Sequence, residues 1–435
     1  MRITIVGTGY QGLVVGTCLA ENGHRVVCVD RDAERIALLK QGQPPIHEPG
    51  LEELVVRNIE EERLQFTSDL GPAVEDCLLI MICVGTPIGP EGDADIGAVL
   101  EATREVAAAM TGYRIIVNKS TCPIGTAEQL TSILRKGTQH AFDVVVNPDF
   151  LKEGAAINDF MAPDRIVLGC DDVRVQEIMK ELYSPFLRTG RPFLNMSARS
   201  AEMTKYATNA MLAVRISLMN QLADICEVYG ADIGEVREGI ASDERLGPTF
   251  LFPGLGFGGL GLPKDLAACI RLAKEKGLDH DLLDAIQRVN DGRQKKFLAR
   301  ILAHYGEAIA TKRIAVWGAS FKPRTDDLRG APALRILDGL REAGAQLCIY
   351  DPVAGPRLRK RYGDAIDVAP KYYAALEGAD GLVIATEWNE FRRPDYERMG
   401  QLMREKTIFD GRNLYTPSVM RGLGFKYVSI GRPEV

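Results

Sequence analysis

The sequence has few of the residues that build metal sites and disulfide frameworks. Its 435 residues include nine cysteines, none of them in a CxxC pair, and five scattered histidines without HxxxH spacing. Most of the cysteines lie inside apolar runs, where a reduced thiol packs as a small hydrophobic side chain. We therefore expect neither a metal site nor a disulfide framework, and such reduced thiols are typical of a cytoplasmic protein.

Long apolar runs and a strong excess of charge are also missing. No uninterrupted apolar run approaches the ~18 residues that a membrane-spanning helix needs. The apolar opening MRITIVGTGYQGLVVGTCLA has glycines at turn spacing, which favours a strand–turn–helix over a signal peptide. A net charge of −6 argues against nucleic acid or an anionic membrane as the main partner. With 46% hydrophobic and 26% charged residues, the chain is expected to be globular and too long for a single core.

Two stretches far apart in the chain share one pattern. Residues 2–30 and 313–351 each contain a short β-branched run, a glycine turn, a helical stretch closing on glycine, and a second apolar run that ends in aspartate. This is the pattern of a βαβ unit. Further buried strands are predicted in six runs: residues 78–87, 114–121, 142–150, 165–170, 380–388 and 407–413. We predict an α/β protein with two doubly wound, Rossmann-like domains.

The segment between these two patterns lacks strand signals. Its apolar residues follow helical spacing, and a long helix is predicted to end at Gly230. We therefore predict an N-terminal domain over residues 1–196, a central helical part over 197–305 and a C-terminal domain over 306–435. The central part also carries GLGFGGLGLPKD (254–265), whose five glycines within eight positions indicate close approach of the backbone to another group.

The first glycine turn has the context of a dinucleotide site. Gly7-x-Gly9-x-x-Gly12 follows a predicted strand and opens a helix, so its amides can hold a pyrophosphate. Asp30 ends the next strand, where a carboxylate accepts hydrogen bonds from a ribose diol and repels a 2′-phosphate. NAD is therefore favoured as the cofactor, and the neighbouring Arg31 keeps NADP as the alternative.

The second glycine turn differs, because GASFKPRTDD (318–327) lacks two of the three glycines. Lys322, Arg324 and Arg329 supply cationic side chains that could hold phosphates instead. A solvated run of charges is the alternative interpretation. The two ends of the chain thus suggest one dinucleotide and one second, phosphorylated ligand.

Taken together, the motifs resemble the UDP-glucose/GDP-mannose dehydrogenase family over essentially the whole chain. The matching segments are residues 7–30, 47–55, 84–87, 118–126, 147–169, 201–217, 256–265, 321–329 and 410–413. The ending LPKD is similar to the branch that takes UDP-glucose or GDP-mannose. The resemblance implies NAD-linked oxidation of a UDP-sugar at C6, from primary alcohol through aldehyde to carboxylate. It also implies an N-terminal NAD domain, a C-terminal nucleotide-sugar domain and a homodimer built on the central helix.

The resemblance also assigns site residues. Lys205 and Asn209 are implied to face the reacting carbon, and their i, i+4 spacing places both on one helix face, as stabilisation of an oxyanion requires. Thr121 and Asp265 would position water and transfer protons. The implied cofactor residues beyond the glycine turn are Tyr10, Thr86, Thr121, Glu153 and Arg329. The implied substrate residues are Phe150, Leu151, Lys152, Phe257, Gly258, Lys322, Arg412 and, from a partner subunit, Arg245. Without the resemblance, Lys205 and Asn209 would be read as solvated residues on a helix surface.

The chain departs from the family pattern at the nucleophile. The family reads GGSCFPKD where this chain reads GGLGLPKD, so Gly261 stands at the position of the catalytic cysteine. Asp149 replaces the glutamate of NPEFL, which helps water to cleave the thioester, and RGAP (329–332) replaces RESP. Cys122 is the one cysteine placed to substitute, although a packing role is the competing interpretation, and Cys269 lies too far along its helix.

Three hypotheses follow from this pattern. The first is a UDP-sugar dehydrogenase that stops at the 6-aldehyde or reaches the acid slowly through its hydrate. The second is an internal redox reaction, such as epimerisation, in which a transient oxidation is reversed and no NADH accumulates. The third is a nucleotide-sugar-binding homologue without turnover, which the retained Lys205, Asn209, Asp265 and Glu153 disfavour.

Overall fold

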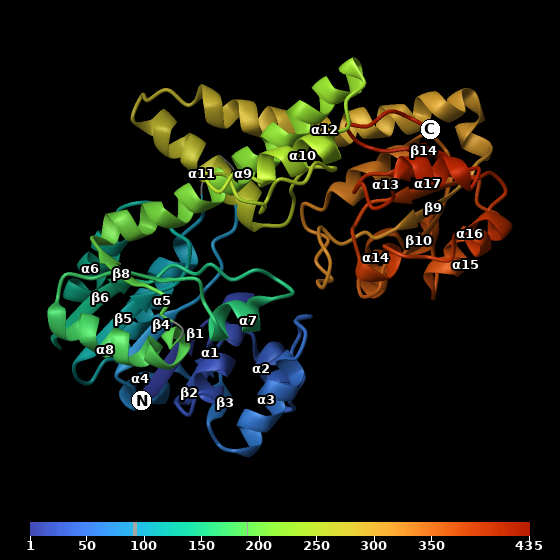
Figure 1. Ribbon diagram of the computed structural model, residues 1–435. Helices are drawn as coiled ribbons and strands as arrows, with labels where there is room; N and C mark the ends of the chain where they lie inside the picture. The colour runs from blue at the N-terminus through green and yellow to red at the C-terminus, as the bar shows by residue number, and fades with distance from the viewer. Residues whose placement is uncertain (90–93, 189) are drawn as a thin grey trace. The chain divides into compact units, whose positions relative to one another are not determined.

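The computed structural model describes residues 1–89, 94–188 and 190–435 and divides into two compact units, Met1–Thr208 and Asn209–Val435. The division falls inside α9 (Ala198–Tyr229). Figure 1 shows the strands of each unit surrounded by helices, as predicted for two doubly wound domains. The three-domain boundaries drawn from the sequence stay a prediction. Among the described residues, no helix combines the length and apolarity needed to cross a membrane.

The first unit is built on an eight-stranded sheet in the order β3-β2-β1-β4-β5-β6-β7-β8. Neighbouring strands are parallel except β6 and β7, which meet in antiparallel register at Val146 and Gly169. The strands are β1 (Arg2–Val6), β2 (Arg25–Val29), β3 (Leu64–Thr67), β4 (Leu79–Ile82), β5 (Arg114–Asn118), β6 (Phe142–Val146), β7 (Ile166–Gly169) and β8 (Phe193–Met196). The order reverses between β1 and β4, which is where ligands gather in such sheets.

Helices cover both faces of this sheet, because alternate strand residues point to opposite sides. Leu79 and Met81 of β4 join a core with α1 (Tyr10–Glu21), α3 (Leu51–Glu60) and α8 (Val173–Tyr183). Ile80 and Ile82 join the opposite core. That second core contains α4 (Leu70–Glu75), α5 (Gly97–Ala109) and α6 (Thr126–Gly137). The remaining helices of the unit are α2 (Ala33–Lys40), α7 (Ala156–Met161) and the short 3-10 helix Ser184–Leu187.

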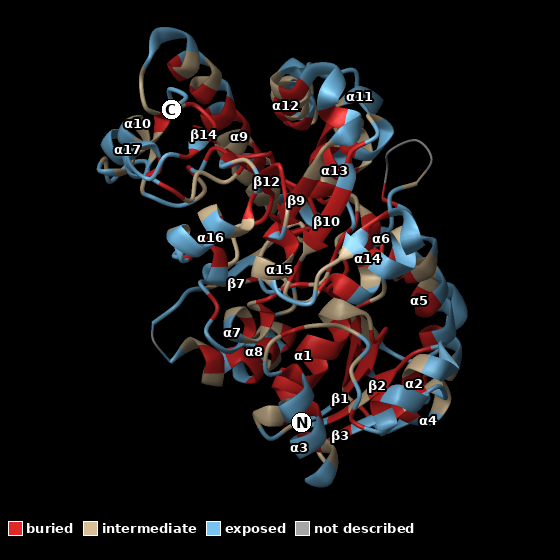
Figure 2. Cartoon of the chain, turned by 90° about the vertical axis from the view of Figure 1, so that its right-hand side faces the viewer, coloured by how far each residue is buried: buried red, intermediate tan, exposed pale blue. Residues whose placement is uncertain are grey.

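The second unit carries a six-stranded, fully parallel sheet in the order β11-β10-β9-β12-β13-β14. Its strands are β9 (Arg313–Trp317), β10 (Gln346–Tyr350), β11 (Asp367–Val368), β12 (Gly381–Ile384), β13 (Thr407–Asp410) and β14 (Lys426–Val428). The α-helices are α10 (Ile233–Ala241), α11 (Gly261–Glu275), α12 (Asp281–Tyr305), α13 (Pro332–Glu342), α14 (Gly355–Tyr362), α15 (Tyr372–Leu376), α16 (Tyr396–Leu402) and α17 (Pro417–Gly422). Figure 2 shows the strands largely buried and the outward helix faces exposed.

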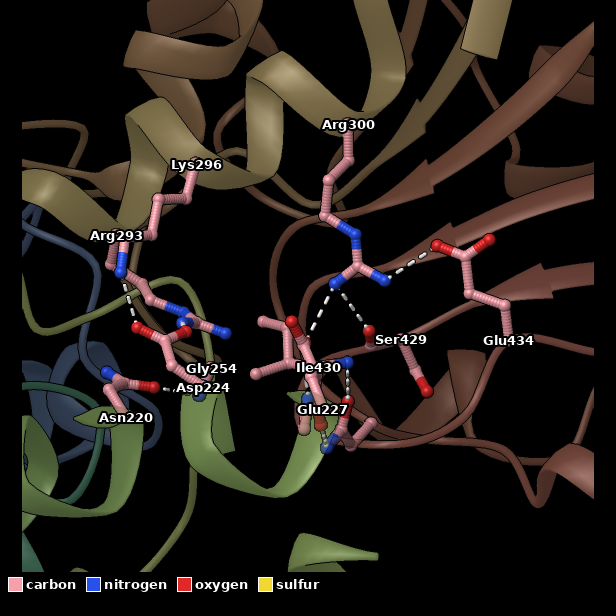
Figure 3. Close-up of polar contacts among 12 residues, drawn as sticks. Asn220, Asp224, Glu227, Gly254, Arg293, Lys296, Arg300, Ser429, Ile430 and Glu434 are labelled. Atoms are coloured by element: carbon pink, nitrogen blue, oxygen red, sulfur yellow. Dashed lines mark hydrogen bonds and ion pairs between the residues drawn. The ribbon is translucent and has the colours of Figure 1, made fainter. Parts of the chain in front are cut away.

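Ion pairs and hydrogen bonds fasten α9 to α12 and to the C-terminal segment (Figure 3). Asp224 of α9 pairs with Arg293 and Lys296 of α12. Glu227 accepts hydrogen bonds from Arg300 Nη1 at 2.9 Å and from the backbone N–H of Gly431 at 2.7 Å. One turn before Asp224, Asn220 Oδ1 accepts from the backbone N–H of Gly254 at 2.8 Å. These contacts place the start of the glycine-rich stretch against α9.

Candidate active site

The turn after β1 has the geometry of a pyrophosphate cradle. A Cβ on Gly12 would lie 1.9 Å from the carbonyl oxygen of Gly7, so only glycine lets α1 begin this close to the turn. A Cβ on Gly9 would meet nothing within 4 Å, which leaves the backbone there open to a ligand. The N-terminus of α1 follows directly, where backbone N–H groups favour an anion. These residues fit the pyrophosphate of a dinucleotide.

Asp30 is held ionised at the end of β2. Its Oδ2 accepts from the backbone N–H and hydroxyl of Thr8, at 2.7 and 2.8 Å, and from Arg35 Nη1 at 3.0 Å. Burial opposes ionisation, but hydrogen bonds from the backbones of Asp32 and Thr8 bring the pKa of Asp30 below its ordinary value. Oδ1 accepts one of these bonds, from Asp32 at 3.0 Å, so one acceptor direction remains for a ribose hydroxyl.

Two arginines lie close to Asp30 in the sequence, and the structure separates their roles. Arg31 extends away to pair with Glu101 at 3.1 Å, with both side chains exposed. Arg35 instead contacts Asp30, a neighbour that the sequence analysis missed. The sequence indicated this contact only through the position of Arg35, which lies in the first turn of α2, three residues after the capping Asp32. The engagement of Arg31 elsewhere supports a cofactor without a 2′-phosphate.

The loops after β4 and β5 bring two expected cofactor residues together. The hydroxyl of Thr86 donates to the backbone oxygen of Thr121 at 2.9 Å. Cys122, the next residue, is buried in the core beneath α5 and α6. This placement agrees with the packing interpretation of Cys122.

Glu48 is a buried carboxylate for which no role was predicted, although it lies in segment 47–55, which matches the family. It is 6% exposed and accepts a hydrogen bond from the hydroxyl of Tyr10, the first residue of α1. It also accepts the backbone N–H groups of Gly154 and Ala156, at 2.6 and 2.8 Å. Burial and then the Glu48 carboxylate raise the pKa of Tyr10. Glu48 thereby fastens the loop that contains Glu153 to the start of α1.

Lys205 and Asp149 form a pair in the first unit, at the loop after β6. The ammonium of Lys205 lies 2.8 Å from the backbone oxygen of Asp149 and 3.1 Å from its Oδ1. Lys205 is 9% exposed, so it is not a solvated helix residue. Two cations lie over the ring of Phe150, Arg165 at 3.6 Å and Lys205 at 5.4 Å from its centroid.

A cavity of ≈ 340 Å³ lies beside this pair. It is lined by residues of the loop after β6, among them Asp149, Phe150, Leu151 and Lys152, and by Lys119 and Tyr183. Lys152 is half-exposed and pairs with Asp159 at 2.8 Å, so its charge is already balanced.

In the second unit, Asn209 and Asp265 lie in contact. The amide of Asn209, near the middle of α9, donates to Asp265 Oδ2. Asp265 is 1% exposed and lies 3.5 Å from the ammonium of Lys264, its neighbour at the start of α11. This arrangement fixes the Asn209 side chain and places a buried carboxylate in the LPKD segment.

The glycine-rich stretch packs its backbone against the second sheet's loops. A Cβ on Gly258 would lie 2.2 Å from the carbonyl oxygen of Gly330, and one on Gly259 would lie 2.7 Å from the Phe321 ring. Phe257 is buried, and Asn290 bonds both its N–H and its carbonyl. Gly261 is the exception, because a Cβ there would meet nothing within 4 Å. The first residue of α11 is therefore a glycine at a position where a Cβ would have free space.

Cationic residues of the second unit are anchored in different ways. Arg412 donates to the backbone oxygen of Ala385 at 2.8 Å and pairs with Glu387 at 3.1 Å. Its guanidinium also borders the glycine-rich stretch, since a Cβ on Gly254 would lie 3.3 Å from Nη1. Arg329 pairs with the buried Asp327 at 2.6 Å.

Lys322 and Arg245 each have a contact with a residue close in the sequence. The Lys322 ammonium lies over the Phe321 ring, 5.4 Å from its centroid. Arg245 is largely exposed and pairs with Asp243 at 2.6 Å. Its expected reach into a partner subunit stays a prediction.

Asp351 is the counterpart of Asp30 in the second βαβ unit. Its carboxylate accepts hydrogen bonds from the backbone of the loops around it. Oδ2 accepts from the N–H groups of Ala319 and Ser320 and from the Ser320 hydroxyl. Oδ1 accepts from the N–H groups of Val353 and Ala354. Each carboxylate oxygen offers about two acceptor directions, so neither oxygen of Asp351 has one open, whereas Oδ1 of Asp30 accepts a single bond.

The nine cysteines are all buried and free. Burial raises the pKa of Cys269 to about 11, which disfavours its thiolate at neutral pH.

The sequence matches the UDP-glucose/GDP-mannose dehydrogenase family in three segments. Residues 1–187 match its NAD binding domain, residues 199–292 its central domain and residues 315–417 its UDP binding domain. UDP-glucose 6-dehydrogenase of Pseudomonas aeruginosa is 44% identical over 445 residues, which covers 100% of this chain and 98% of that protein. UDP-glucose 6-dehydrogenase of Rhizobium meliloti is 44% identical over 439 residues and 100% of both chains.

A solved structure has the same fold. The UDP-glucose dehydrogenase of Pyrobaculum islandicum superposes with a TM-score of 0.88 at 34% identity, covering 94% of each chain. The match to the NAD binding domain, together with the cradle at Gly12 and the open acceptor of Asp30, identifies the cofactor as NAD. The chain therefore belongs to the UDP-glucose/GDP-mannose dehydrogenase family and is an NAD-dependent oxidoreductase acting on nucleotide sugars.

Proposed function

We propose that this protein oxidises the C6 alcohol of UDP-glucose, or of a close UDP-sugar relative, and releases chiefly the 6-aldehyde, with slow further conversion to the acid. The relatives named above act on UDP-glucose, and the C-terminal segment matches a UDP binding domain. The observation that carries the proposal is Gly261, directly before the LPKD segment, where the family pattern has its nucleophilic cysteine.

The two oxidation steps make different demands on the protein. The first needs a base, a group that stabilises charge on the oxygen, and NAD, which supplies the two-electron acceptor. The second starts from an aldehyde, whose carbon gives up hydride only after a nucleophile has added to it. A thiolate adds to form a thiohemiacetal, which is oxidised to a thioester that water then cleaves. Gly261 supplies no such atom, and the nine thiols elsewhere are buried.

Specific contacts hold the residues of the first step, and they support the roles that the family resemblance implies. Lys205, anchored by Asp149, and Asn209, anchored by Asp265, lie one helical turn apart on α9. We assign both to stabilising negative charge on the C6 oxygen. Asp265, buried and next to Lys264, is assigned to proton transfer with Thr121. Asp149 is engaged by Lys205, which supports a weaker contribution to thioester cleavage than a longer glutamate would give.

A stoichiometry experiment tests this function. The purified protein is incubated with NAD and UDP-glucose, NADH is followed by its absorbance, and the product is identified by mass. One NADH per sugar with an aldehyde or its hydrate is expected. Two NADH per sugar at the rate of thiol-bearing relatives would refute the proposal. A changed sugar without net NADH would point to internal redox chemistry. A sugar left untouched with UDP-glucose and also with GDP-mannose would point to a binding protein.

We further propose that the protein is a homodimer that pairs through α9. Met211, Leu218 and Ile225 repeat every seven residues on this helix and are at least half-exposed, as are Val228 and Tyr229 near its end. The opposite face, with Met219, Ala223 and Cys226, is buried in the second unit's core. A hollow of ≈ 520 Å³ between α9 and α12 adjoins the exposed residues. A second copy would cover this apolar stripe.

A further inference from the structure

Lys119 is a buried lysine whose ammonium contacts neutral groups. It directly follows β5 and is 4% exposed. Nζ lies 3.0 Å from Oδ1 and 3.3 Å from the backbone oxygen of Asn147, and 3.4 Å from the hydroxyl of Tyr183. Among the residues that the structure describes, no carboxylate forms an ion pair with it. Burying a charge without a counter-charge costs several kcal/mol, so a lysine at this place needs a compensating role.

The contacts of Lys119 fix Asn147 in one orientation. β5 and β6 are parallel neighbours, which brings the residues after their carboxyl ends together. Asn147 Oδ1 accepts from Lys119 and, at 2.6 Å, from the hydroxyl of Tyr183. Its Nδ2 donates to the backbone oxygen of Val167 at 2.8 Å. Every polar group of this side chain is thus engaged, and the loop leaves β6 in a fixed direction.

That loop reaches Asp149 two residues later, where Lys205 is anchored. Lys119 and Asp149 line the same cavity of ≈ 340 Å³. Both charges also act on the thiol of Cys83. Burial raises the pKa of Cys83 to about 12, while Lys119 lowers and Asp149 raises it. Lys119 and Asp149 therefore both lie within electrostatic range of this one thiol.

We propose that Lys119 is a positioning residue for the dehydrogenase reaction: through Asn147 it holds the loop whose Asp149 anchors Lys205. The inference rests on the proposed role of Lys205 in the first oxidation. It assigns to Lys119 no contact with the substrate. The charge explains why a lysine rather than an apolar residue occupies the site, since three acceptors converge on one ammonium.

The test compares Lys119→Met, which keeps the length and removes charge and donors, with the wild-type chain. Tyr183→Phe removes one donor to Asn147 and is the milder variant. Tyr305→Phe is the matched control, because that buried hydroxyl bonds the backbone oxygen of Asp380 in the second unit. Hydrogen exchange of the amides of residues 149–154, thermal unfolding, and kcat and KM for NAD and UDP-glucose are measured for each.

In Lys119→Met we expect exchange in residues 149–154 to accelerate about 10-fold. We expect kcat to fall about 10- to 100-fold with KM for NAD nearly unchanged. Tyr183→Phe should shift both in the same direction by less, and Tyr305→Phe should shift neither. Unchanged loop exchange, exchange raised evenly along the chain, or a loosened loop with unchanged kcat would each overturn the proposal. If Lys119→Met does not fold, the comparison of Tyr183→Phe with Tyr305→Phe decides.

If the wild-type chain turns over no UDP-glucose, the proposed function fails on its own. The exchange comparison then still decides whether Lys119 holds the loop, and titration of UDP-glucose into wild type and Lys119→Met replaces kcat. An affinity lowered along with loop order supports the positioning role, and an unchanged affinity refutes it.

Discussion

A cysteine at position 261 would occupy free space at the first residue of α11, because nothing lies within 4 Å of its Cβ position. The N-terminus of a helix lowers the pKa of a thiol there and favours the reactive thiolate. Gly261→Cys should therefore form a thioester from the bound aldehyde. We expect a second NADH per sugar in the first turnover, with a covalent sugar adduct detectable in the intact protein mass.

The release of that adduct tests Asp149 separately. We expect Gly261→Cys alone to accumulate the adduct, and Gly261→Cys with Asp149→Glu to form acid at least about 100-fold faster than the single variant. Gly261→Ser is the matched control, since a hydroxyl of similar size is a far weaker nucleophile. An adduct-free Gly261→Cys protein that still yields one NADH would contradict the assignment of position 261.

Asp30 links cofactor recognition to acid stability. Its folded pKa is lowered, so its interactions stabilise the fold above its unfolded pKa of about 3.9, and this stability is lost as pH falls through the folded value. Asp30→Asn should lower the unfolding temperature at neutral pH. The gap between the two proteins should narrow between about pH 5 and pH 3. A gap independent of pH, measured by thermal unfolding, would show that the charge of Asp30 contributes nothing.

At the scale of elements, the glycine-rich stretch shows where backbone approach is obligatory. Gly258→Ala would press a methyl group against the carbonyl oxygen of Gly330, a contact that neither backbone can relieve by a rotamer change. We expect a loss of about 2 to 3 kcal/mol in unfolding free energy, measured in urea. Gly261→Ala, three residues on, is the control and should cost almost nothing. Equal losses would mean that the stretch is held by chain stiffness rather than by contact.

The strands and α9 were predictable from the sequence because the spacing of apolar residues follows the face of each element that is buried. The helix predicted to end at Gly230 ends at Tyr229. The predicted strands were too long at their polar ends: residues 142–150 yield only β6 (Phe142–Val146), because Asn147 to Phe150 leave the sheet to form the loop that anchors Lys205. The short edge strands of both sheets, β3, β8, β11 and β14, were missed, since few residues carry their pattern.

The site was predictable where a motif is local and was missed where distant segments meet. The glycine turn and Asp30 lie within one βαβ unit, so their spacing alone indicated a dinucleotide. Lys119 and Glu48 act on residues 28 and 106 positions away, and no local pattern reports such contacts. The resemblance supplied Lys205 and Asn209, which spacing alone could not distinguish from solvated helix residues.

At the scale of the whole molecule, the exposed stripe on α9 should decide the oligomeric state. Leu218→Asp places a charge in the middle of Met211, Leu218 and Ile225 and should convert a dimer to a monomer, as measured by light scattering after size exclusion. Leu282→Asp, at a leucine near the start of α12 that is more exposed than Leu218, is the control and should leave the mass unchanged. A wild-type monomer at micromolar concentration would refute the dimer.

The fully engaged Asp351 has a consequence for redesign. Its carboxylate braces two turns of the second sheet, so exchanging it removes their scaffold before any new ligand can be accommodated. Transplanting dinucleotide specificity to the C-terminal half would thus demand remodelling of both loops at once. The two domains share a Rossmann-like architecture, but Asp30 and Asp351, which follow corresponding strands, have different roles.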